Sequence, residues 1–238
     1  MTTKERYAAV FGALRAKMGR VQSELDFASP FQLLVAVMLS AQCTDRRVNM
    51  VTPALFSRFP DAQSMAGATF EEVFELVRSI SYPRTKAEHL LGAARMIMGE
   101  FGGEIPATVE QLKRLPGVGQ KTANVVAAIA FGEPVIAVDT HIFRVSRRLG
   151  LSEGKTVEAV EKDLTANIPA EERPDSHHYL LLHGRYVCTA RKPRCGECPV
   201  SEWCREFASG MKNAASKVSK GTVKVKTEGN GTRKVVNN

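Results

Sequence analysis

The nine residues Leu115-Pro-Gly-Val-Gly-Gln-Lys-Thr-Ala123 lie between two segments with helical periodicity. Pro116 and Gly117 are expected to end the first helix, and Gly119 to permit a tight reversal with close approach by another backbone. The second helix then presents its free N–H groups and the positive end of its dipole towards the hairpin. That arrangement favours a bound anion such as phosphate. An ordinary turn between two helices is the alternative.

The layout is that of a helix-hairpin-helix motif, which holds DNA through backbone contacts that do not depend on base sequence. We place the motif at about residues 108–131. The hairpin residues expected to contact DNA are Leu115, Gly117, Val118, Gly119, Lys121 and Thr122.

Helix signals dominate the rest of the chain. Ser29 precedes Pro30 and an apolar run to Leu39, which predicts an N-cap, a first helical residue and a buried helix. Capping-box spacing recurs at Thr69/Glu72, Thr85/Glu88 and Thr108/Gln111. Further helices are predicted at residues 70–80, 86–101, 109–115, 120–131, 140–149, 157–166 and 176–187. The best strand candidate, Val135–Val138, is short enough to be a buried extended link, so we predict an all-α fold.

The composition is that of a globular protein with a basic balance. The 238 residues leave room for one large domain or two modest ones, and the formal net charge is +8. This charge suits a polyanionic partner, although a solvated basic protein would look the same. No apolar run approaches the length of a membrane span, and the N-terminus lacks an apolar signal core, so we expect a cytoplasmic protein without membrane association.

The last thirty residues differ from the rest. Residues 209–238 hold seven Lys and Arg against one acidic residue, a local charge of +6, and no aromatic residue. Such a segment cannot bury enough apolar surface to offset its chain entropy, so we predict a disordered basic tail over residues 208–238. It either tethers the protein to DNA in a salt-dependent way or only aids solubility.

Lys121 and Asp139 are the candidate catalytic pair. Lys121 falls in the first turn of the second hairpin helix, where the helix dipole and partial burial would disfavour its cation. A neutral amine can attack an electrophilic carbon and form a Schiff base, whereas a charged one would simply pair with phosphate. Asp139 follows the run Val135–Val138 and is first of all a good helix N-cap. A carboxylate there could also accept a proton from the nucleophile or stabilise positive charge on a sugar.

Four cysteines predict a metal centre. Cys188, Cys195, Cys198 and Cys204 have the spacing C-x6-C-x2-C-x5-C, and four thiolates within 17 residues are a strong metal signal. The spacing alone does not decide between an iron–sulfur cluster and a zinc ion. The first loop between these cysteines carries three basic residues expected to contact DNA phosphates: Arg191, Lys192 and Arg194.

The hairpin string, the stretch Val138-Asp-Thr-His-Ile-Phe-Arg-Val-Ser-Arg-Arg-Leu-Gly150 and the cysteine pattern together resemble the endonuclease III family, iron–sulfur DNA glycosylase/AP lyases of the helix-hairpin-helix superfamily. The stretches Leu39–Asp45 and His178–Cys198, the latter including His183-Gly-Arg-Tyr, fit the same pattern. The resemblance covers roughly residues 5–207.

The resemblance implies a [4Fe-4S] cluster and a partner, double-stranded DNA with an oxidised pyrimidine or an abasic site. It implies that Lys121 attacks C1′ with assistance from Asp139, and that β-elimination then cuts the strand. It also implies a six-helix barrel at about residues 23–133, and a cluster domain from residues 1–22 and 134–207. We expect a monomer in the cytoplasm, associated with the nucleoid.

The resemblance implies roles for further residues. Gln42 is the candidate residue to fill the space that a flipped nucleotide leaves in the base stack. Gln42, Asp45 and His141 are the expected residues of the damaged-base pocket. Arg144 is an expected DNA contact. The segment Ser81-Tyr-Pro83 departs from many relatives, so damage and opposite-base preference are in doubt. Tyr82 either wedges into the duplex or packs against the following helix.

Three other functions are alternatives. An adenine-removing relative would carry a glutamate within the segment matching Leu39–Asp45 and a further folded domain, and neither is evident in the sequence. A monofunctional mismatch glycosylase would lack the lysine at position 121. A non-catalytic DNA-binding or redox-sensing module would not need the complete Lys121/Asp139 pair.

Overall fold

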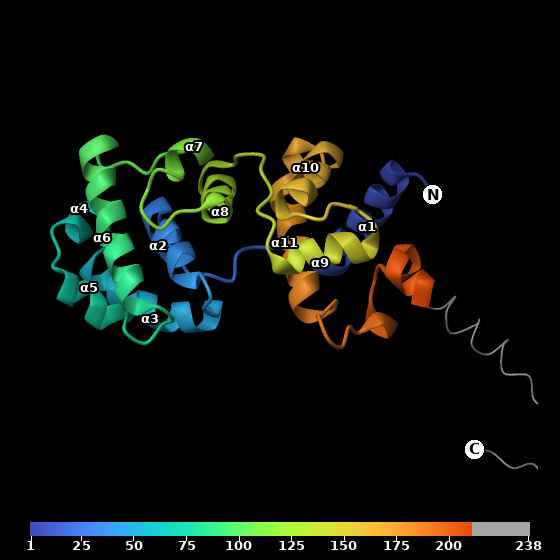
Figure 1. The fold of residues 1–238 in the computed structure, drawn as a ribbon, viewed down its shortest axis with the longest axis horizontal. Coiled ribbons are helices and arrows are strands. Elements are labelled where there is room, and N and C mark those ends of the chain that lie inside the picture. The colour runs from blue at the N-terminus through green and yellow to red at the C-terminus, as the bar shows by residue number, and fades with distance from the viewer. Residues whose placement is uncertain (211–238) are drawn as a thin grey trace, which may run out of the picture.

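The computed structural model describes residues 1–210, and within them it contains helices, turns and loops but no β-strand, which confirms the all-α fold (Figure 1). The predicted basic tail falls almost wholly outside these residues. The α-helices are α1 (Thr3–Met18), α2 (Pro30–Ser40), α3 (Asp45–Arg58), α4 (Ala62–Ala66), α5 (Phe70–Val77), α6 (Pro83–Glu100), α7 (Val109–Leu112), α8 (Gln120–Phe131), α9 (Thr140–Leu149), α10 (Val157–Asn167) and α11 (Arg173–Tyr186). Short 3-10 turns occur at Ala170–Glu172, Cys195–Glu197 and Ser201–Trp203.

Most predicted helix starts are confirmed. The Ser29 hydroxyl accepts a hydrogen bond from the Gln32 N–H at 3.2 Å, with Pro30 as first helical residue. Thr69 forms a reciprocal capping box with Glu72. Helices α8 and α9 have the predicted bounds, because both begin and end at strong local signals that include αL glycines at their C-termini.

The predicted capping box at Thr85 is wrong. Helix α6 begins two residues earlier at Pro83, so Thr85 lies inside the helix. The N-cap is Tyr82, which has left-handed backbone angles and makes no side-chain cap. Proline suits the first helical position, because it has no N–H to leave unpaired there.

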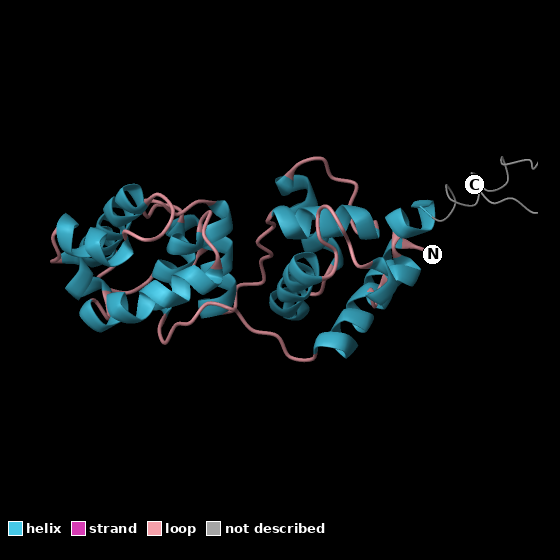
Figure 2. Ribbon diagram, turned by 90° about the horizontal axis from the view of Figure 1, so that it is seen from below, coloured by secondary structure: helices cyan, strands magenta, loops and turns pink. Residues whose placement is uncertain are grey.

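The apolar side chains form two separate clusters. One joins buried residues of α2 to α8, between Leu25 and Ala127. The other joins α1 to α9, α10 and α11, and reaches the cysteine region at Val200. Figures 1 and 2 show the corresponding two groups of helices side by side, with α1 packed in the second group although it begins the chain. The division at residues 22/23 and 133/134 stays our proposal.

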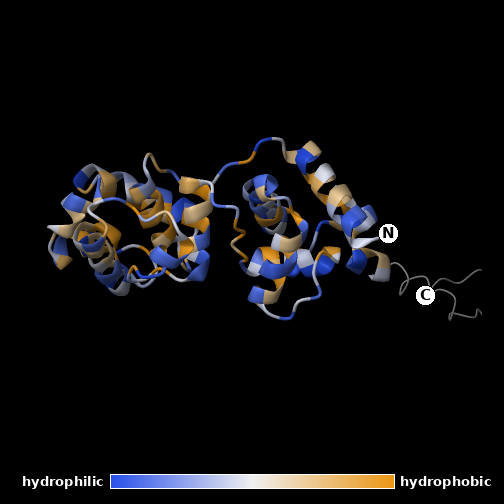
Figure 3. Ribbon diagram, turned by 90° about the horizontal axis from the view of Figure 1, so that it is seen from above, coloured by the Kyte–Doolittle hydropathy of each residue, from blue (hydrophilic) through white to orange (hydrophobic). Residues whose placement is uncertain are grey.

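Two chain segments join these groups. The first follows α1 and leads to α2, and the second is the run Val135–Val138 between α8 and α9. Figure 3 shows the second as a hydrophobic link. Ile136, Ala137 and Val138 are almost fully buried in it, without strand pairing. The link sets Asp139 directly opposite the start of α8, so burial of this run is what brings the two candidate catalytic residues together.

No helix in the described part of the chain is long and apolar enough to cross a membrane.

Candidate active site

Lys121 lies in the first turn of α8. Gly119 is the N-cap and supplies no side-chain cap, so the first N–H groups of the helix lack the usual capping partner. The predicted partial burial of Lys121 is wrong, since 58% of its side chain is exposed. The hairpin holds the amine at the surface, where it is accessible to a large substrate.

The two hairpin glycines have different roles from those predicted. Gly117 has a φ of +77°, and a Cβ atom there would lie 2.6 Å from Nδ1 of His89, so this glycine makes the tight turn. Gly119 has an ordinary φ of −90°, and a Cβ atom there would meet nothing within 4 Å. The missing side chain of Gly119 therefore leaves the start of α8 open. Leu115 and Val118 are buried and anchor the hairpin.

Asp139 serves as the helix cap that was predicted and also faces Lys121. Its Oδ1 accepts hydrogen bonds from the N–H groups of His141 at 2.9 Å and Ile142 at 2.8 Å. Its other oxygen, Oδ2, lies 3.8 Å from Nζ of Lys121. One carboxylate oxygen thus fixes the orientation of the group, and the second is left for the lysine.

Two adjoining cavities surround this pair. The smaller has a volume of about 60 Å³, and Lys121, Asp139 and His177 are among its lining residues. The larger has a volume of about 790 Å³, and Asp45 and His141 line it. Both share Glu24, Asp45 and Arg185, so the smaller cavity with the reactive pair adjoins the larger one.

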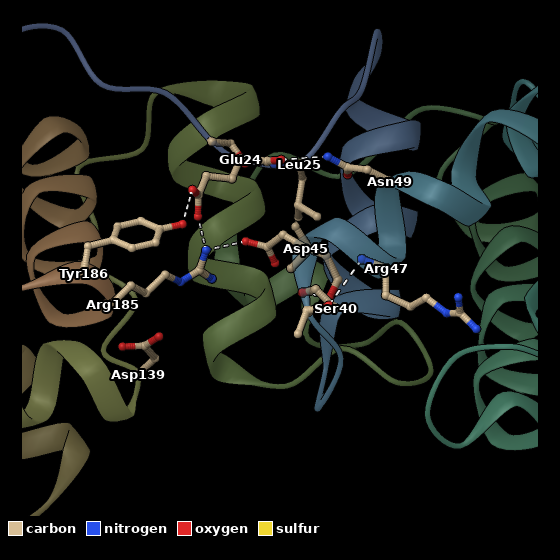
Figure 4. Close-up of polar contacts among 12 residues, drawn as sticks. Glu24, Leu25, Ser40, Asp45, Arg47, Asn49, Asp139, Arg185 and Tyr186 are labelled. Atoms are coloured by element: carbon tan, nitrogen blue, oxygen red, sulfur yellow. Dashed lines mark hydrogen bonds and ion pairs between the residues drawn. The ribbon is translucent and has the colours of Figure 1, made fainter. Parts of the chain in front are cut away.

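Arg185 organises the wall of the larger cavity. Its guanidinium forms an ion pair with Asp45 at 2.5 Å and another with Glu24, and Glu24 also accepts a hydrogen bond from Tyr186 (Figure 4). These bonds join residues more than 100 positions apart, so no local pattern predicts them. The string His183-Gly-Arg-Tyr was the only sequence signal for Arg185, and it assigned no role.

Gln42 and Tyr82 share an unusual feature. Within the described residues they are the two non-glycine residues with positive φ, at +54° and +55°, and both are exposed. Such backbone angles cost of order 1 kcal/mol each and persist only where the surroundings enforce them. The Ser81 hydroxyl donates to the Gln42 carbonyl at 2.8 Å, so the two strained turns are tied together.

Lys86 is the main support of the Gln42 turn. This lysine is 7% exposed, and its Nζ donates to the carbonyls of Leu39 at 2.8 Å and Ala41 at 2.6 Å. Burial lowers the pKa of Lys86. No local sequence pattern predicts this role of Lys86.

We expect Lys86→Met to destabilise the fold by about 1–3 kcal/mol, because it leaves two carbonyls at the end of α2 without their donor. Urea unfolding measures this change. The exposed Lys113, which bonds only to the side chain of Gln120, provides the matched variant Lys113→Met. Equal stability of the two variants would contradict the bracing role of Lys86.

His177 is a buried titratable group that lines the same cavity as Lys121 and Asp139. It is 7% exposed, and burial lowers its pKa to about 3, with the neighbouring His178 as the second cause. The unfolded chain would take up this proton near pH 6.5, whereas the folded protein would not. Stability attributable to His177 is therefore complete above pH 6.5 and falls as the pH drops from 6.5 towards 3.

Between pH 7.5 and pH 5.5 the loss from His177 should be about 1.4 kcal/mol, given a pKa shift of this size. Urea unfolding at both pH values, compared between the wild type and His177→Asn, isolates this contribution. Between these two pH values, His177→Asn should lose about 1.4 kcal/mol less stability than the wild type. An identical pH dependence in both proteins would show that His177 does not titrate as described.

The four cysteines share one pocket. Cys188, Cys195, Cys198 and Cys204 all line it, together with apolar side chains such as Leu149, Val187 and Phe207. Among residues 1–210, no group of His, Cys, Asp or Glu side chains is placed to hold a single metal ion. Four thiols around a common hollow are a suitable ligand set for a metal centre.

Two of the cysteine sulfur atoms have side-chain nitrogen atoms close to them. Nη1 of Arg148 lies 3.6 Å from Cys188 Sγ, and Nε2 of His183 lies 3.6 Å from Cys198 Sγ. N–H groups directed at sulfur are a usual means of stabilising cluster thiolates. Burial raises the pKa of the Cys198 and Cys204 thiols, so binding of a cluster must release their protons.

The basic residues predicted to touch DNA fall into two groups. Arg191, Lys192 and Arg194 are exposed on the loop between the first two cysteines. Of these, Arg194 also donates to the Tyr186 carbonyl and pairs with Glu197 at 3.5 Å. Arg144 is half-buried, and its guanidinium donates to the carbonyls of Cys188 at 3.1 Å and Gly184 at 2.9 Å. It braces α9 against the cysteine segment, and a contact of Arg144 with DNA stays a prediction.

Comparison with known families gives two matches. Residues 35–170 match the model of the HhH-GPD superfamily of base excision DNA repair proteins. Residues 188–204, which hold the four cysteines, match the iron–sulfur binding domain of endonuclease III. The cofactor of this chain is a [4Fe-4S] cluster, and that the four cysteines of the matched segment are its ligands stays a prediction.

Curated relatives and solved structures agree. Endonuclease III of Synechocystis sp. is 46% identical over 84% of this chain and 92% of its own length. Endonuclease III of Escherichia coli is 45% identical over 84% of this chain and 95% of its own length. A solved trapped endonuclease III–DNA covalent intermediate, an estranged-adenine complex, superposes with a TM-score of 0.83 at 42% identity, covering 89% of this chain and 100% of that one. The chain belongs to the endonuclease III family.

Proposed function

We propose that the chain is a bifunctional DNA glycosylase and AP lyase of base excision repair, with Lys121 as nucleophile and Asp139 as its proton acceptor. The observation that carries this proposal is the 3.8 Å approach of Lys121 Nζ to Asp139 Oδ2 at the edge of a cleft. Nucleophile and base within reach of one another, with the base held by a third group, are the usual signature of covalent catalysis. Here the third group is the start of α9.

The reaction follows from these two groups. The Lys121 ammonium loses a proton towards Asp139, and the free amine attacks C1′ of the damaged nucleotide. The bond from C1′ to the base breaks, and the base leaves with the electron pair. The attached nitrogen then loses a second proton, the C1′–O4′ bond breaks, and O4′ takes up a proton, which leaves a protonated imine between Nζ and C1′. Removal of a proton from C2′ then expels the 3′ phosphate by β-elimination, and water releases the enzyme.

The cleft suits a nucleotide turned out of the duplex. Reaching C1′ and releasing a base requires flipping, which costs a few kcal/mol and leaves a gap in the stack. We propose that the side chain of Gln42 fills this gap, because its exposed turn is already held in an unusual backbone conformation. Asp45 and His141 line the larger cavity, and with Gln42 they form the proposed pocket for an oxidised pyrimidine. Tyr82 stands beside this turn as the proposed wedge.

Two surfaces of the protein would contact the DNA backbone. The open start of α8 offers N–H groups to a phosphate on one side of the lesion, and the hairpin positions them without reading sequence. The loop with Arg191, Lys192 and Arg194 would contact phosphates on the other side. The [4Fe-4S] cluster gives this loop a rigid frame. We also propose that the protein acts as a monomer on DNA of the nucleoid.

The test uses a duplex with a single thymine glycol and a duplex with a single abasic site. The proposal predicts release of the base and cleavage of the strand 3′ to the lesion, both at the same site. Base release with an intact strand would favour a monofunctional glycosylase. Binding without base release would favour a passive DNA-binding module. Either result would overturn the proposed activity.

A further inference from the structure

Arg185 of α11 holds its two ion-pair partners with a single nitrogen atom. Nη1 pairs with Asp45 at 2.5 Å and also with Glu24, and Figure 4 shows both bonds at this one atom. Nε and Nη2 have no hydrogen-bond partner within residues 1–210. A guanidinium carries five N–H donors in a planar fork, so the edge formed by Nε and Nη2 is left with unused donors.

These two nitrogen atoms are accessible. In the described part of the chain, the fully buried side-chain N and O atoms without a partner are Ser146 Oγ and His177 Nδ1, so Nε and Nη2 of Arg185 are not fully buried. The Arg185 side chain is 27% exposed, and it lines both cavities of the active site. Donors that have neither a protein partner nor full burial are available to a ligand in these cavities.

The place of Arg185 fits one particular atom of a flipped base. Glu24, Asp45 and Arg185 line both the larger cavity and the smaller one, which holds Lys121 and Asp139. Of these three, the ionised carboxylates can only accept hydrogen bonds, so Arg185 is the donor at the boundary. Lys121 attacks C1′, C1′ is bonded to N1 of a pyrimidine, and O2 lies on the ring atom next to N1. A base that extends from the reactive pair into the larger cavity therefore brings O2 to this boundary.

We propose that Arg185 binds O2 of the damaged pyrimidine through Nε or Nη2 and stabilises the base as it leaves. When the C1′–N1 bond breaks, its electron pair stays with N1 and is shared with O2, and the base anion then takes a proton from water. Arg185 gives up no proton, because a guanidinium stays charged at any working pH. This inference rests on the proposed function, and it adds the residue that assists departure of the base.

The chemistry of oxidised pyrimidines makes this contact important. In an intact pyrimidine, the C5–C6 double bond carries part of the charge on N1 to O4. Thymine glycol lacks this double bond, so the charge on N1 can spread only to O2. A fixed donor at O2 therefore stabilises the part of the leaving base where the charge collects.

The two carboxylates fix the guanidinium before a base arrives. Asp45 is the first residue of α3 and Glu24 precedes α2, so the ion pairs hold Arg185 from two separate segments. Preorganised donors need not reorient as charge develops, which is the source of their effect in active sites. The carboxylates also offset the positive charge of Arg185, so the expected contribution is a directed hydrogen bond and not a general attraction for anions.

Arg185→Lys tests the contact, because it keeps a cation beside Glu24 and Asp45 but replaces three nitrogen atoms with one. Single-turnover release of thymine glycol should slow about 10²-fold, the cost of removing one donor to a developing oxyanion. Cleavage of a duplex with an abasic site, which has no base at C1′, should stay within about threefold of the wild type. Affinity for the thymine glycol duplex should also stay within about threefold, since O2 gains charge only in the transition state.

Arg15→Lys is the matched control. Arg15 forms an ion pair with Glu172 at 2.8 Å and lines a separate cavity beside α1, so this variant should keep both activities. Release of thymine glycol by Arg185→Lys at the wild-type rate would overturn the inference. Equal losses in base release and abasic-site cleavage would also overturn it, because they would indicate a distorted site. A wild type that cleaves neither duplex would instead contradict the proposed function.

If Arg185→Lys does not fold, a crystal structure of Lys121→Gln bound to a thymine glycol duplex decides instead. This variant lacks the nucleophile and leaves the base attached to the sugar. Nε or Nη2 of Arg185 should lie within about 3.2 Å of O2, the normal hydrogen-bond range. A flipped base whose O2 contacts other groups would overturn the inference.

Discussion

Lys121→Gln should lose all strand cleavage at abasic sites and slow base release by roughly 10³-fold or more, because it removes the atom that bonds to the sugar. The side chain is more than half exposed, so the substitution should leave the fold intact. The glutamine side chain is slightly shorter and can still hydrogen bond, but an amide nitrogen does not attack C1′. Single-turnover assays and gel separation of the product strands measure both steps.

The control for this prediction is Lys155→Gln, a change at an exposed lysine in the loop between α9 and α10. It alters the net charge by the same amount and should retain wild-type activity. DNA affinity of the Lys121 variant should fall only a few fold, as one lost charge near phosphate implies. Strand cleavage that persists in Lys121→Gln would mean that another amine is the nucleophile.

Asp139→Asn should separate the two functions of this residue. Asparagine is as good an N-cap as aspartate, so the bonds to His141 and Ile142 can form through the amide oxygen and stability should change little. The side chain can no longer accept a proton from Lys121, and base excision should slow by about 10²–10⁴-fold. Urea unfolding and single-turnover excision, performed on the same preparation, test both halves.

Asp139→Ala completes this comparison. It removes the cap as well as the carboxylate, so it should also lose about 1 kcal/mol of stability. If Asp139→Asn excises bases at the wild-type rate, the carboxylate is only a cap. If Asp139→Asn is as unstable as Asp139→Ala, the catalytic loss could not be read separately from the structural one.

Local signals predicted eight of the eleven α-helices in residues 1–210, because caps and breakers act over a few residues, and they missed α1, α3 and α4. Ser29-Pro30 and Asp139 each satisfy N–H groups that lie within four positions of them. The failure at Thr85 has a tertiary cause. Tyr82 and Pro83 start α6 earlier than Thr85 would, and bonds from Ser81 and Lys86 to the Gln42 turn hold that start in place.

The site was predictable in its chemistry but not in its geometry. The hairpin string and the cysteines identify the reaction type, yet only the buried link at residues 135–138 brings Asp139 to Lys121. The ion pairs of Arg185 with Glu24 and Asp45 join parts of the chain 161 and 140 positions apart. The burial of His177 likewise depends on how α11 packs, which periodicity does not reveal.

The most direct test of the central claim is to locate the covalent bond. Wild-type protein is mixed with an abasic duplex in the presence of borohydride, which reduces the imine to a stable amine. After digestion of the DNA and treatment with trypsin, tandem mass spectrometry should find the sugar remnant on Lys121, within the peptide of residues 115–144, because modified Lys121 resists cleavage. A remnant on another amine, or none at all, would contradict the assignment of Lys121 as nucleophile.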